Sequence, residues 1–265
     1  MQNLRISLVQ THLDWQQPEQ NRERLTRLLA PLVGQTDLIV LPEMFTTGFT
    51  MEPETVAEPM SGPTLAWLRE QASTLGAALC GSVVIEDGGY RNRLLFVTPD
   101  GAVEYYDKRH LFRMANEHQH YVAGEIRQVI EYRGWRILPQ VCYDLRFPVW
   151  CRNRNDYDLM LYVANWPSPR RHAWRTLLLA RAIENQCYLA GVNRVGEDGK
   201  GLEYTGDSLL VDFKGQALLD APAGEAFVKT GTLDGEALQQ FRQKFPAWQD
   251  ADPFSIALDS QEAKA

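Results

Sequence analysis

A cysteine, Cys142, stands between an apolar, strand-like run from Trp135 to Val141 and a segment that reads as the start of a helix. At the N-terminus of a helix, free N–H groups and the positive end of the helix dipole favour a thiolate and can hold an oxyanion. This position suits a nucleophile. Buried free cysteines are common in intracellular proteins, however, so Cys142 needs reactive partners before it indicates catalysis.

Two further reactive side chains stand at the ends of predicted strands. Glu43 follows the short apolar run 37–41, where partial desolvation suits a general base. Lys108 follows a hairpin predicted between Asn92 and Tyr106. Loops beyond strand ends are where sheets carry chemistry. A carboxylate, an ammonium and a thiol presented there together predict nucleophilic catalysis by Cys142.

The elements that must position these side chains alternate between helices and strands. Apolar residues recur at helical spacing from Leu25 to Leu32, from Leu65 to Leu75 and across Ala173 to Asn185, and a last helix is expected from Gly235 to Phe245. The pattern runs on without a linker rich in Pro, Gly or Ser, so we predict an α/β fold in one domain over residues 1–265, with helices covering sheets. The predicted strands include Ile6 to Gln10, Ala77 to Ile85, Leu159 to Ala164 and Tyr188 to Val192.

Composition argues against two classes of partner. The chain has 265 residues, 45% hydrophobic, and a formal net charge of −7, so it can bury a large core but lacks the basic surface that nucleic acids or anionic membranes attract. No run reaches the about 20 apolar residues of a membrane span, and residues 1–5 contain no signal-type apolar segment. We therefore expect a cytoplasmic protein with a small-molecule substrate and neither nucleic acid nor membrane as a partner.

The sequence contains no recognisable cofactor or metal motif. The four cysteines form no zinc or disulfide pattern, and the glycines form neither a dinucleotide fingerprint nor a phosphate loop. Glu117, His118 and His120 lie close together, but their spacing is not that of a zinc site. We interpret this segment as a loop that forms a pocket wall, and we expect no cofactor and no metal.

The order of Glu43, Lys108 and Cys142, with the residues around them, resembles the nitrilase superfamily of carbon–nitrogen hydrolases. The resemblance runs from the first strand to about Asp234. The Cys142 motif, the later Ala164-Asn165-Trp166-Pro167 and the compact length are similar to the omega-amidase branch, which hydrolyses 2-oxoglutaramate and 2-oxosuccinamate. The motifs that carry the resemblance are Leu41-Pro42-Glu43-Met44, Asp107-Lys108-Arg109-His110-Leu111-Phe112, Cys142-Tyr143-Asp144-Leu145-Arg146-Phe147-Pro148 and Ala182-Ile183-Glu184-Asn185-Gln186.

The resemblance implies a structure and a set of roles. The fold would be a four-layer α-β-β-α sandwich of the nitrilase type, paired across a helical face into a homodimer. Glu43, Lys108 and Cys142 would be catalytic. Glu117, which precedes Gly124 in the loop after the lysine, would play a supporting role by orienting Lys108 or tuning Glu43.

These roles predict hydrolysis through a thioester. An ordinary thiol has a pKa of about 8.5, so Cys142 needs a base, and Glu43 would take its proton. Lys108 and the backbone N–H of Tyr143 would hold the carbonyl oxygen as it becomes anionic, a contact worth about 3 to 4 kcal/mol per donor. Ammonia leaves with a proton from Glu43, and water activated by Glu43 then releases the acid.

The substrate-binding residues are less constrained by the sequence. Phe45, Tyr143 and Trp166 stand beside catalytic or strand-end positions and could form apolar walls, with His118 on the wall formed by the loop. Arg146 is expected in an internal ion pair, because a buried arginine needs a carboxylate partner. The candidates for binding a substrate carboxylate are Arg113, Arg170 and Arg171.

Alternatives to an omega-amidase remain open. The same triad could act on deaminated glutathione, an N-carbamoyl compound or a nitrile, although nitrilases usually carry Trp-Glu where Tyr143-Asp144 stands here. A non-enzymatic, nitrilase-like binding domain is a third class. Such domains typically lose a triad member, whereas Glu43, Lys108 and Cys142 are all present.

Overall fold

The computed structural model describes residues 1–257, whose strands form two six-stranded sheets and one two-stranded sheet. In the first sheet, β1, β2 and β3 are parallel neighbours, and the remaining pairs are antiparallel. Its strands, in spatial order, are β14 (Phe227–Leu233), β1 (Leu4–Gln10), β2 (Leu38–Val40), β3 (Ala78–Glu86), β4 (Tyr90–Val97) and β5 (Val103–Asp107).

The second sheet repeats this plan, with β7, β8 and β9 parallel at its centre and antiparallel strands outside them. The two-stranded sheet is a hairpin of β10 (Val195–Glu197) and β11 (Glu203–Thr205). The strands of the second sheet, in spatial order, are β13 (Ala217–Leu219), β12 (Leu209–Val211), β9 (Tyr188–Asn193), β8 (Leu159–Ala164), β7 (Trp135–Val141) and β6 (Ile130–Tyr132).

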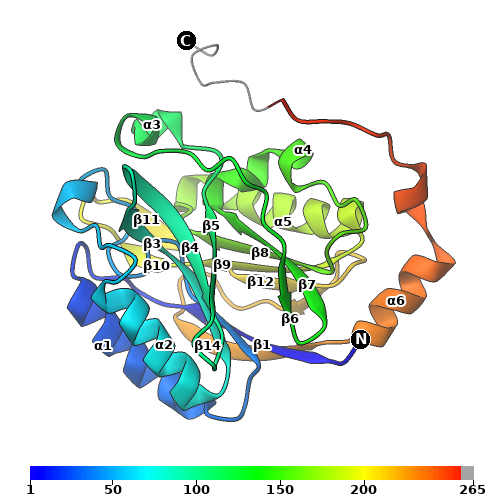
Figure 1. Ribbon diagram of the computed structural model, residues 1–265, viewed down its shortest axis with the longest axis horizontal. Coiled ribbons are helices and arrows are strands. Elements are labelled where there is room, and N and C mark those ends of the chain that lie inside the picture. Colours follow the sequence, from blue (N-terminus) through cyan, green and yellow to red (C-terminus); the bar gives the residue numbers. More distant parts are fainter. Residues whose placement is uncertain (258–265) are drawn as a thin grey trace.

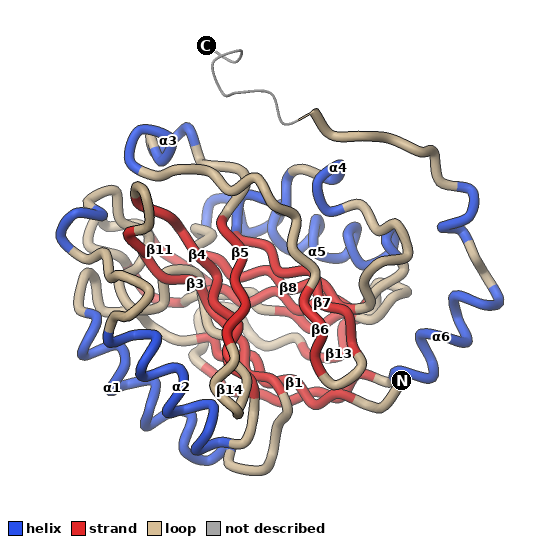
Figure 2. The backbone as a smooth tube through the Cα atoms, in the orientation of Figure 1, coloured by secondary structure: helices blue, strands red, loops and turns tan. Residues whose placement is uncertain are grey.

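Helices cover the outer faces of both sheets (Figures 1 and 2). Helices α1 (Pro18–Leu29) and α2 (Pro63–Leu75) lie side by side on the first sheet, and α5 (Arg171–Asn185) lies on the second. Shorter helices are α3 (Glu117–His120), α4 (Pro148–Cys151) and α6 (Gly235–Lys244). None of the helices within residues 1–257 is both long and apolar enough to cross a membrane.

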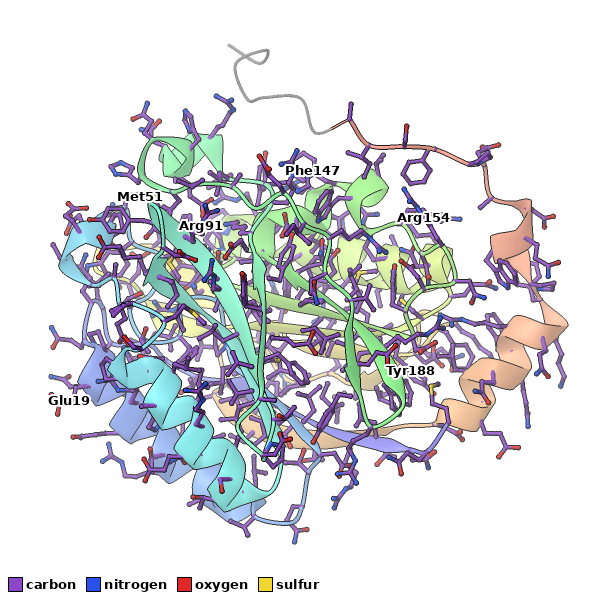
Figure 3. The ribbon with its side chains drawn as sticks, in the orientation of Figure 1. Glu19, Met51, Arg91, Phe147, Arg154 and Tyr188 are labelled. Carbon is purple, nitrogen blue, oxygen red and sulfur yellow. The ribbon has the colours of Figure 1, made fainter. Side chains whose placement is uncertain are left out.

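Alternation along the strands explains the four layers. In β8, Leu159, Leu161 and Val163 enter the core between the sheets, while Met160 and Tyr162 pack under α5. Because successive side chains of a strand point to opposite faces, a strand buried on both sides reads as one continuous apolar run. Tyr188 of β9 belongs to the core between the sheets and is labelled in Figure 3. The predicted four-layer α-β-β-α arrangement is confirmed.

Three local details differ from the sequence predictions. The segment after Val141 is a 3₁₀ helix of five residues, Cys142–Arg146, and the predicted loop at 117–120 contains the single turn α3. The β10–β11 hairpin was not predicted, because its short strands are largely polar and lack a clear apolar alternation.

Candidate active site

Cys142 begins the turn that follows β7, and its backbone is strained. Its φ is 45°, in the left-handed region that non-glycine residues rarely adopt. Such a conformation costs about 1 to 3 kcal/mol and persists only where its surroundings fix it. The carboxylate of Asp144 accepts a hydrogen bond from the Val141 N–H at 3.0 Å and so fixes the residue before the thiol. Cys142 therefore stands at the junction between β7 and the 3₁₀ helix Cys142–Arg146.

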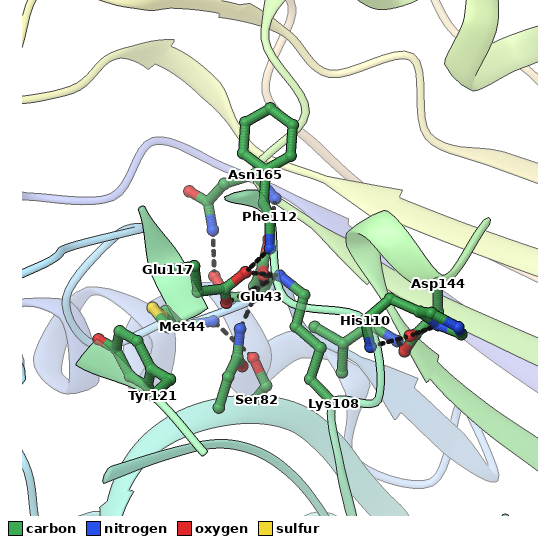
Figure 4. A network of polar contacts seen from close by, with 12 residues as sticks. Glu43, Met44, Ser82, Lys108, His110, Phe112, Glu117, Tyr121, Asp144 and Asn165 are labelled. Atoms are coloured by element: carbon green, nitrogen blue, oxygen red, sulfur yellow. Dashed lines mark hydrogen bonds and ion pairs between the residues drawn. The ribbon is translucent and has the colours of Figure 1, made fainter. Parts of the chain in front are cut away.

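Glu43 lies beyond the end of β2 and is completely buried. Its Oε1 accepts hydrogen bonds from Asn92 Nδ2 at 2.8 Å and Lys108 Nζ at 3.1 Å. Its Oε2 accepts one from the Asn165 backbone N–H at 2.7 Å. The next residue, Met44, has a φ of 42° and donates its N–H to Ser82 Oγ at 2.8 Å. This web, shown in Figure 4, holds the carboxylate in one orientation.

Lys108 follows β5 directly and is also buried. Its Nζ lies 2.9 and 3.0 Å from the two oxygens of Glu117, which begins α3. Burial alone lowers the pKa of Lys108, but the charges of Glu117 and Glu43 outweigh burial and raise it above its ordinary value. Burial raises the pKa of Glu117, and the charge of Lys108 opposes that shift only in part. Lys108 is therefore a fixed cation.

The electrostatics of Cys142 differ from the sequence expectation. Desolvation raises the pKa of the thiol well above its ordinary value, and the charge of Glu43 and a hydrogen bond to it raise it further, against the opposing charge of Lys108. The predicted lowering of the thiol pKa by a helix N-terminus is thus wrong, because the helix is a 3₁₀ segment of only five residues and burial has the opposite effect. The Cys142 thiol thus lies beside the carboxylate of Glu43, a group that could accept its proton.

A cavity of about 250 Å³ opens above Lys108 and Cys142. Apolar and aromatic groups form most of its wall, and cationic side chains stand among them. Its lining residues are Phe49, Met51, Lys108, Phe112, Ala115, Cys142, Tyr143, Arg146, Asn165, Trp166, Pro167, Arg170, Asp198, Lys200, Leu202 and Tyr204. A larger hollow of about 980 Å³ near α6 contains none of the reactive groups described above.

The structure brings some of the predicted substrate-binding residues to this cavity. Tyr143, Trp166 and Arg170 line it, and the Arg170 guanidinium lies 5.3 Å from the centre of the Phe112 ring. Arg146 also lines the cavity, with its guanidinium 4.9 Å from the Trp166 ring centre. Arg146 forms no ion pair within residues 1–257. The predicted internal ion pair of Arg146 is therefore wrong.

Other predicted substrate-binding residues lie elsewhere. Phe45 is completely buried in the core under α2, 5.8 Å from the Trp67 ring, where its apolar ring is removed from water. Arg171 pairs with Asp207 through bonds of 3.0 and 2.7 Å. Arg113 and His118 are absent from the cavity lining within the described residues. None of these four residues lines the cavity, so the prediction that they form its wall or bind the substrate carboxylate is wrong.

Sequence reasoning missed the two asparagines that hold Glu43. Asn165 belongs to the Ala164-Asn165-Trp166-Pro167 motif, and besides its backbone contact it donates Nδ2 to the Glu43 carbonyl oxygen at 2.6 Å. For Asn92, the sequence predicts only a place in the strand that begins the hairpin. Neither residue carries a charge or a spacing signal. Within residues 1–257, no three His, Cys, Asp or Glu side chains gather as a possible metal site.

Comparison with known proteins agrees with this geometry. The model of the carbon-nitrogen hydrolase family matches residues 5–243. Omega-amidase YafV of Escherichia coli (strain K12) is 51% identical over 257 residues, covering 97% of this chain and 100% of that protein. The 2-oxoglutaramate amidase of Bacillus subtilis (strain 168) is 30% identical and covers 92% of this chain and 96% of its own length.

A solved structure shows the same fold. XC1258 from Xanthomonas campestris, a CN-hydrolase superfamily protein with an arsenic adduct in its active site, matches with a TM-score of 0.95 and 54% identity. The match covers 97% of this chain and 100% of that one. By sequence, by fold and by the family match over residues 5–243, the chain belongs to the carbon–nitrogen hydrolase family of the nitrilase superfamily.

Proposed function

We propose that the protein is an omega-amidase, which hydrolyses 2-oxoglutaramate and related monoamides such as 2-oxosuccinamate to the 2-oxo acid and ammonia. The observation that carries the proposal is the 51% identity with omega-amidase YafV over 97% of the chain. The buried Glu43–Lys108 pair beside the Cys142 thiol supplies a mechanism for amide hydrolysis.

In the first half of the reaction, Glu43 accepts the thiol proton as the Cys142 sulfur attacks the amide carbon. Burial beside Glu43 raises the pKa of the Cys142 thiol, so the thiol needs this base to become nucleophilic. The amide oxygen becomes anionic and is held by Lys108 Nζ and by the Tyr143 N–H, which lies in the first turn of a helix and so needs no intrahelical acceptor. The C–N bond breaks, the nitrogen takes the proton from Glu43, and ammonia leaves.

In the second half, the acyl group is bound to Cys142 as a thioester. Glu43 accepts a proton from water, the hydroxide attacks the thioester carbon, and the same donors hold the second oxyanion. The C–S bond breaks and the sulfur regains the proton from Glu43. Glu117 supports both halves by anchoring Lys108 at 2.9 and 3.0 Å.

For the substrate carboxylate, we propose Arg146 and Arg170. Both line the cavity, each beside an aromatic ring, and neither forms an ion pair among residues 1–257. Arg171 is already bound to Asp207. A cavity of about 250 Å³ with Tyr143 and Trp166 in its walls suits a short acyl chain. Support for a 2-oxo group in the substrate comes from the sequence resemblance.

We also propose that residues 1–265 form one carbon–nitrogen hydrolase domain, which acts in the cytoplasm as a homodimer. Support for a single domain comes from the family match over residues 5–243. Support for the dimer comes only from the sequence resemblance. Sedimentation velocity of the purified full chain tests the dimer, because the molar mass obtained should be twice that of the 30.2 kDa chain.

Ammonia release from a panel of amides tests the activity. At equal concentration, we expect kcat/KM to be highest for 2-oxoglutaramate and low for glutamine, whose α-ammonium would lose hydration without gaining a partner. The panel includes deaminated glutathione, an N-carbamoyl compound and a nitrile. If deaminated glutathione has the highest kcat/KM, the omega-amidase proposal fails. If none of the compounds is hydrolysed, a non-enzymatic, nitrilase-like binding domain replaces the omega-amidase as the proposed function.

A further inference from the structure

Asp144 lies two residues after Cys142 and is completely buried. Its two carboxylate oxygens receive contacts from three different segments of the chain. Oδ1 accepts the His110 backbone N–H at 2.9 Å and lies 2.7 Å from His110 Nδ1. Oδ2 accepts the Val141 N–H at 3.0 Å and the Tyr106 hydroxyl at 2.8 Å. Figure 4 shows the His110 side of this contact.

The two oxygens together bind residues on both sides of the active site. On the Lys108 side, Oδ2 accepts the hydroxyl of Tyr106, which is two residues before Lys108. Oδ1 holds His110, which is two residues after Lys108. Oδ2 holds Val141, which directly precedes Cys142. One carboxylate therefore joins the segment that carries the cation to the strained turn that carries the thiol.

The surroundings of Asp144 keep these contacts in place. Phe147 stacks on the His110 ring with centroids 3.8 Å apart and an interplanar angle of 6°. Trp150 Nε1 donates to the Tyr106 hydroxyl at 3.0 Å, and Tyr106 is 1% exposed. In an interior shielded from water, hydrogen bonds to a carboxylate are strong, and the loss of one destabilises the folded protein.

We propose that Asp144 is a positioning residue that fixes the Lys108 ammonium relative to the Cys142 sulfur, an inference that rests on the proposed amide hydrolysis. The φ of 45° at Cys142 must be held by its neighbours, and the contact to Val141 is adjacent to it. Asp144 acts only through these segments and does not line the cavity.

Asp144→Asn tests this role because an amide has one oxygen where the carboxylate has two. Whichever way the amide turns, its NH₂ group must face backbone N–H donors, either that of His110 or that of Val141. One of the two segments must therefore shift. A shift of about 1 Å in a reacting group can cost about 10²-fold in rate.

We expect Asp144→Asn to lower kcat for 2-oxoglutaramate about 10²-fold while KM changes little. The matched control is Asp158→Asn, which alters another buried aspartate, one that binds Arg136 and Arg242 outside the cavity. It should lower Tm but preserve kcat. If Asp144→Asn folds with wild-type kcat, the proposal is overturned. If Asp144→Asn does not fold, His110→Ala removes the imidazole contact to Asp144 and the stacking on Phe147 but keeps the backbone N–H contact. It should still lower kcat at constant KM, and an unchanged kcat there also overturns the proposal.

Alkylation of Cys142 by iodoacetamide separates this inference from the proposed function. The reaction needs no substrate, so it is informative even if the wild-type protein hydrolyses none of the amides, an outcome that would reject the proposed function alone. Displacement of the thiol from Glu43 should slow alkylation of Cys142 in Asp144→Asn relative to the wild type and Asp158→Asn. Equal rates in all three proteins contradict a positioning role.

Discussion

Lys108 Nζ lies 2.9 and 3.0 Å from the two carboxylate oxygens of Glu117, and both side chains are buried. A third contact of 3.1 Å joins the same nitrogen to Glu43. Because these carboxylates raise the pKa of Lys108, the ammonium has no tendency to give up its proton. In the proposed mechanism, Lys108 therefore holds the developing oxyanion and Glu43 transfers the protons.

Lys108→Ala should lower kcat by about 10²-fold or more, because it removes a preorganised oxyanion donor. Steady-state kinetics on 2-oxoglutaramate measure the change. Removal of the cation also leaves two buried carboxylates facing each other, so Tm should fall as well. The double variant Lys108→Ala with Glu117→Gln relieves that repulsion. It should regain stability without regaining kcat, and recovery of kcat would contradict the oxyanion role.

Glu43→Gln should lower the rates of acylation and deacylation together, since it preserves the shape of the side chain but removes the proton acceptor. Rapid-quench measurement of ammonia and acid release separates the two steps. The control is Glu58→Gln, which alters a buried carboxylate that accepts the Thr64 N–H at 2.7 Å and lies outside the cavity lining. It should lower Tm and leave kcat unchanged. Loss of only one of the two steps in Glu43→Gln would require a second base.

Arg146→Ala and Arg170→Ala should each raise KM for 2-oxoglutaramate about tenfold or more, because a hydrogen bond to a charged group is worth about 1.5 to 3 kcal/mol. Succinamate, which keeps a carboxylate, should show the same loss, and a neutral short-chain amide should not. Arg113→Ala is the control, since Arg113 is exposed and outside the cavity lining. An unchanged KM in both cavity variants would remove the proposed carboxylate site.

The stability contributed by Asp158 should depend on pH in a defined direction. Burial alone raises the pKa of Asp158, but hydrogen bonds and charges from Arg136 and Arg242 outweigh burial and lower it. A lowered folded pKa means that the stabilisation is fully present above the unfolded value of about 3.9 and is lost as pH falls through the folded value. Urea unfolding of wild type and Asp158→Asn should show a large difference in free energy at about pH 7 that shrinks below about pH 3. A constant difference would contradict the ion-pair account.

The sequence predicted the elements whose patterns are periodic. Alternation and apolar runs predicted strands such as β8, and leucine spacing predicted α1 and α2, because burial of one face imposes a period on the chain. The meeting of Glu43, Lys108 and Cys142 was also predictable, since each follows a strand. The hairpin of β10 and β11 has no such period, although its residues line the cavity.

The direction of single side chains was not predictable. Phe45 directly follows the Glu43 motif and Arg146 lies within the Cys142 motif, yet Phe45 packs in the core and Arg146 lines the cavity. Positive φ angles precede both residues, 42° at Met44 and 45° at Cys142, and sequence periodicity carries no information about such strained positions. The raised pKa of the Cys142 thiol likewise depends on burial beside Glu43, which becomes apparent only in three dimensions.

Rapid quenching of the wild-type protein during turnover of 2-oxoglutaramate, followed by peptide mass spectrometry, tests the thioester mechanism most directly. The proposed mechanism predicts the acyl group of the substrate on the peptide that contains Cys142, formed and lost in step with the release of ammonia and acid. The adduct should be absent from Cys142→Ala, which should also be inactive. Ammonia release without an adduct on Cys142, or with an adduct on Cys80, Cys151 or Cys187 instead, would contradict it.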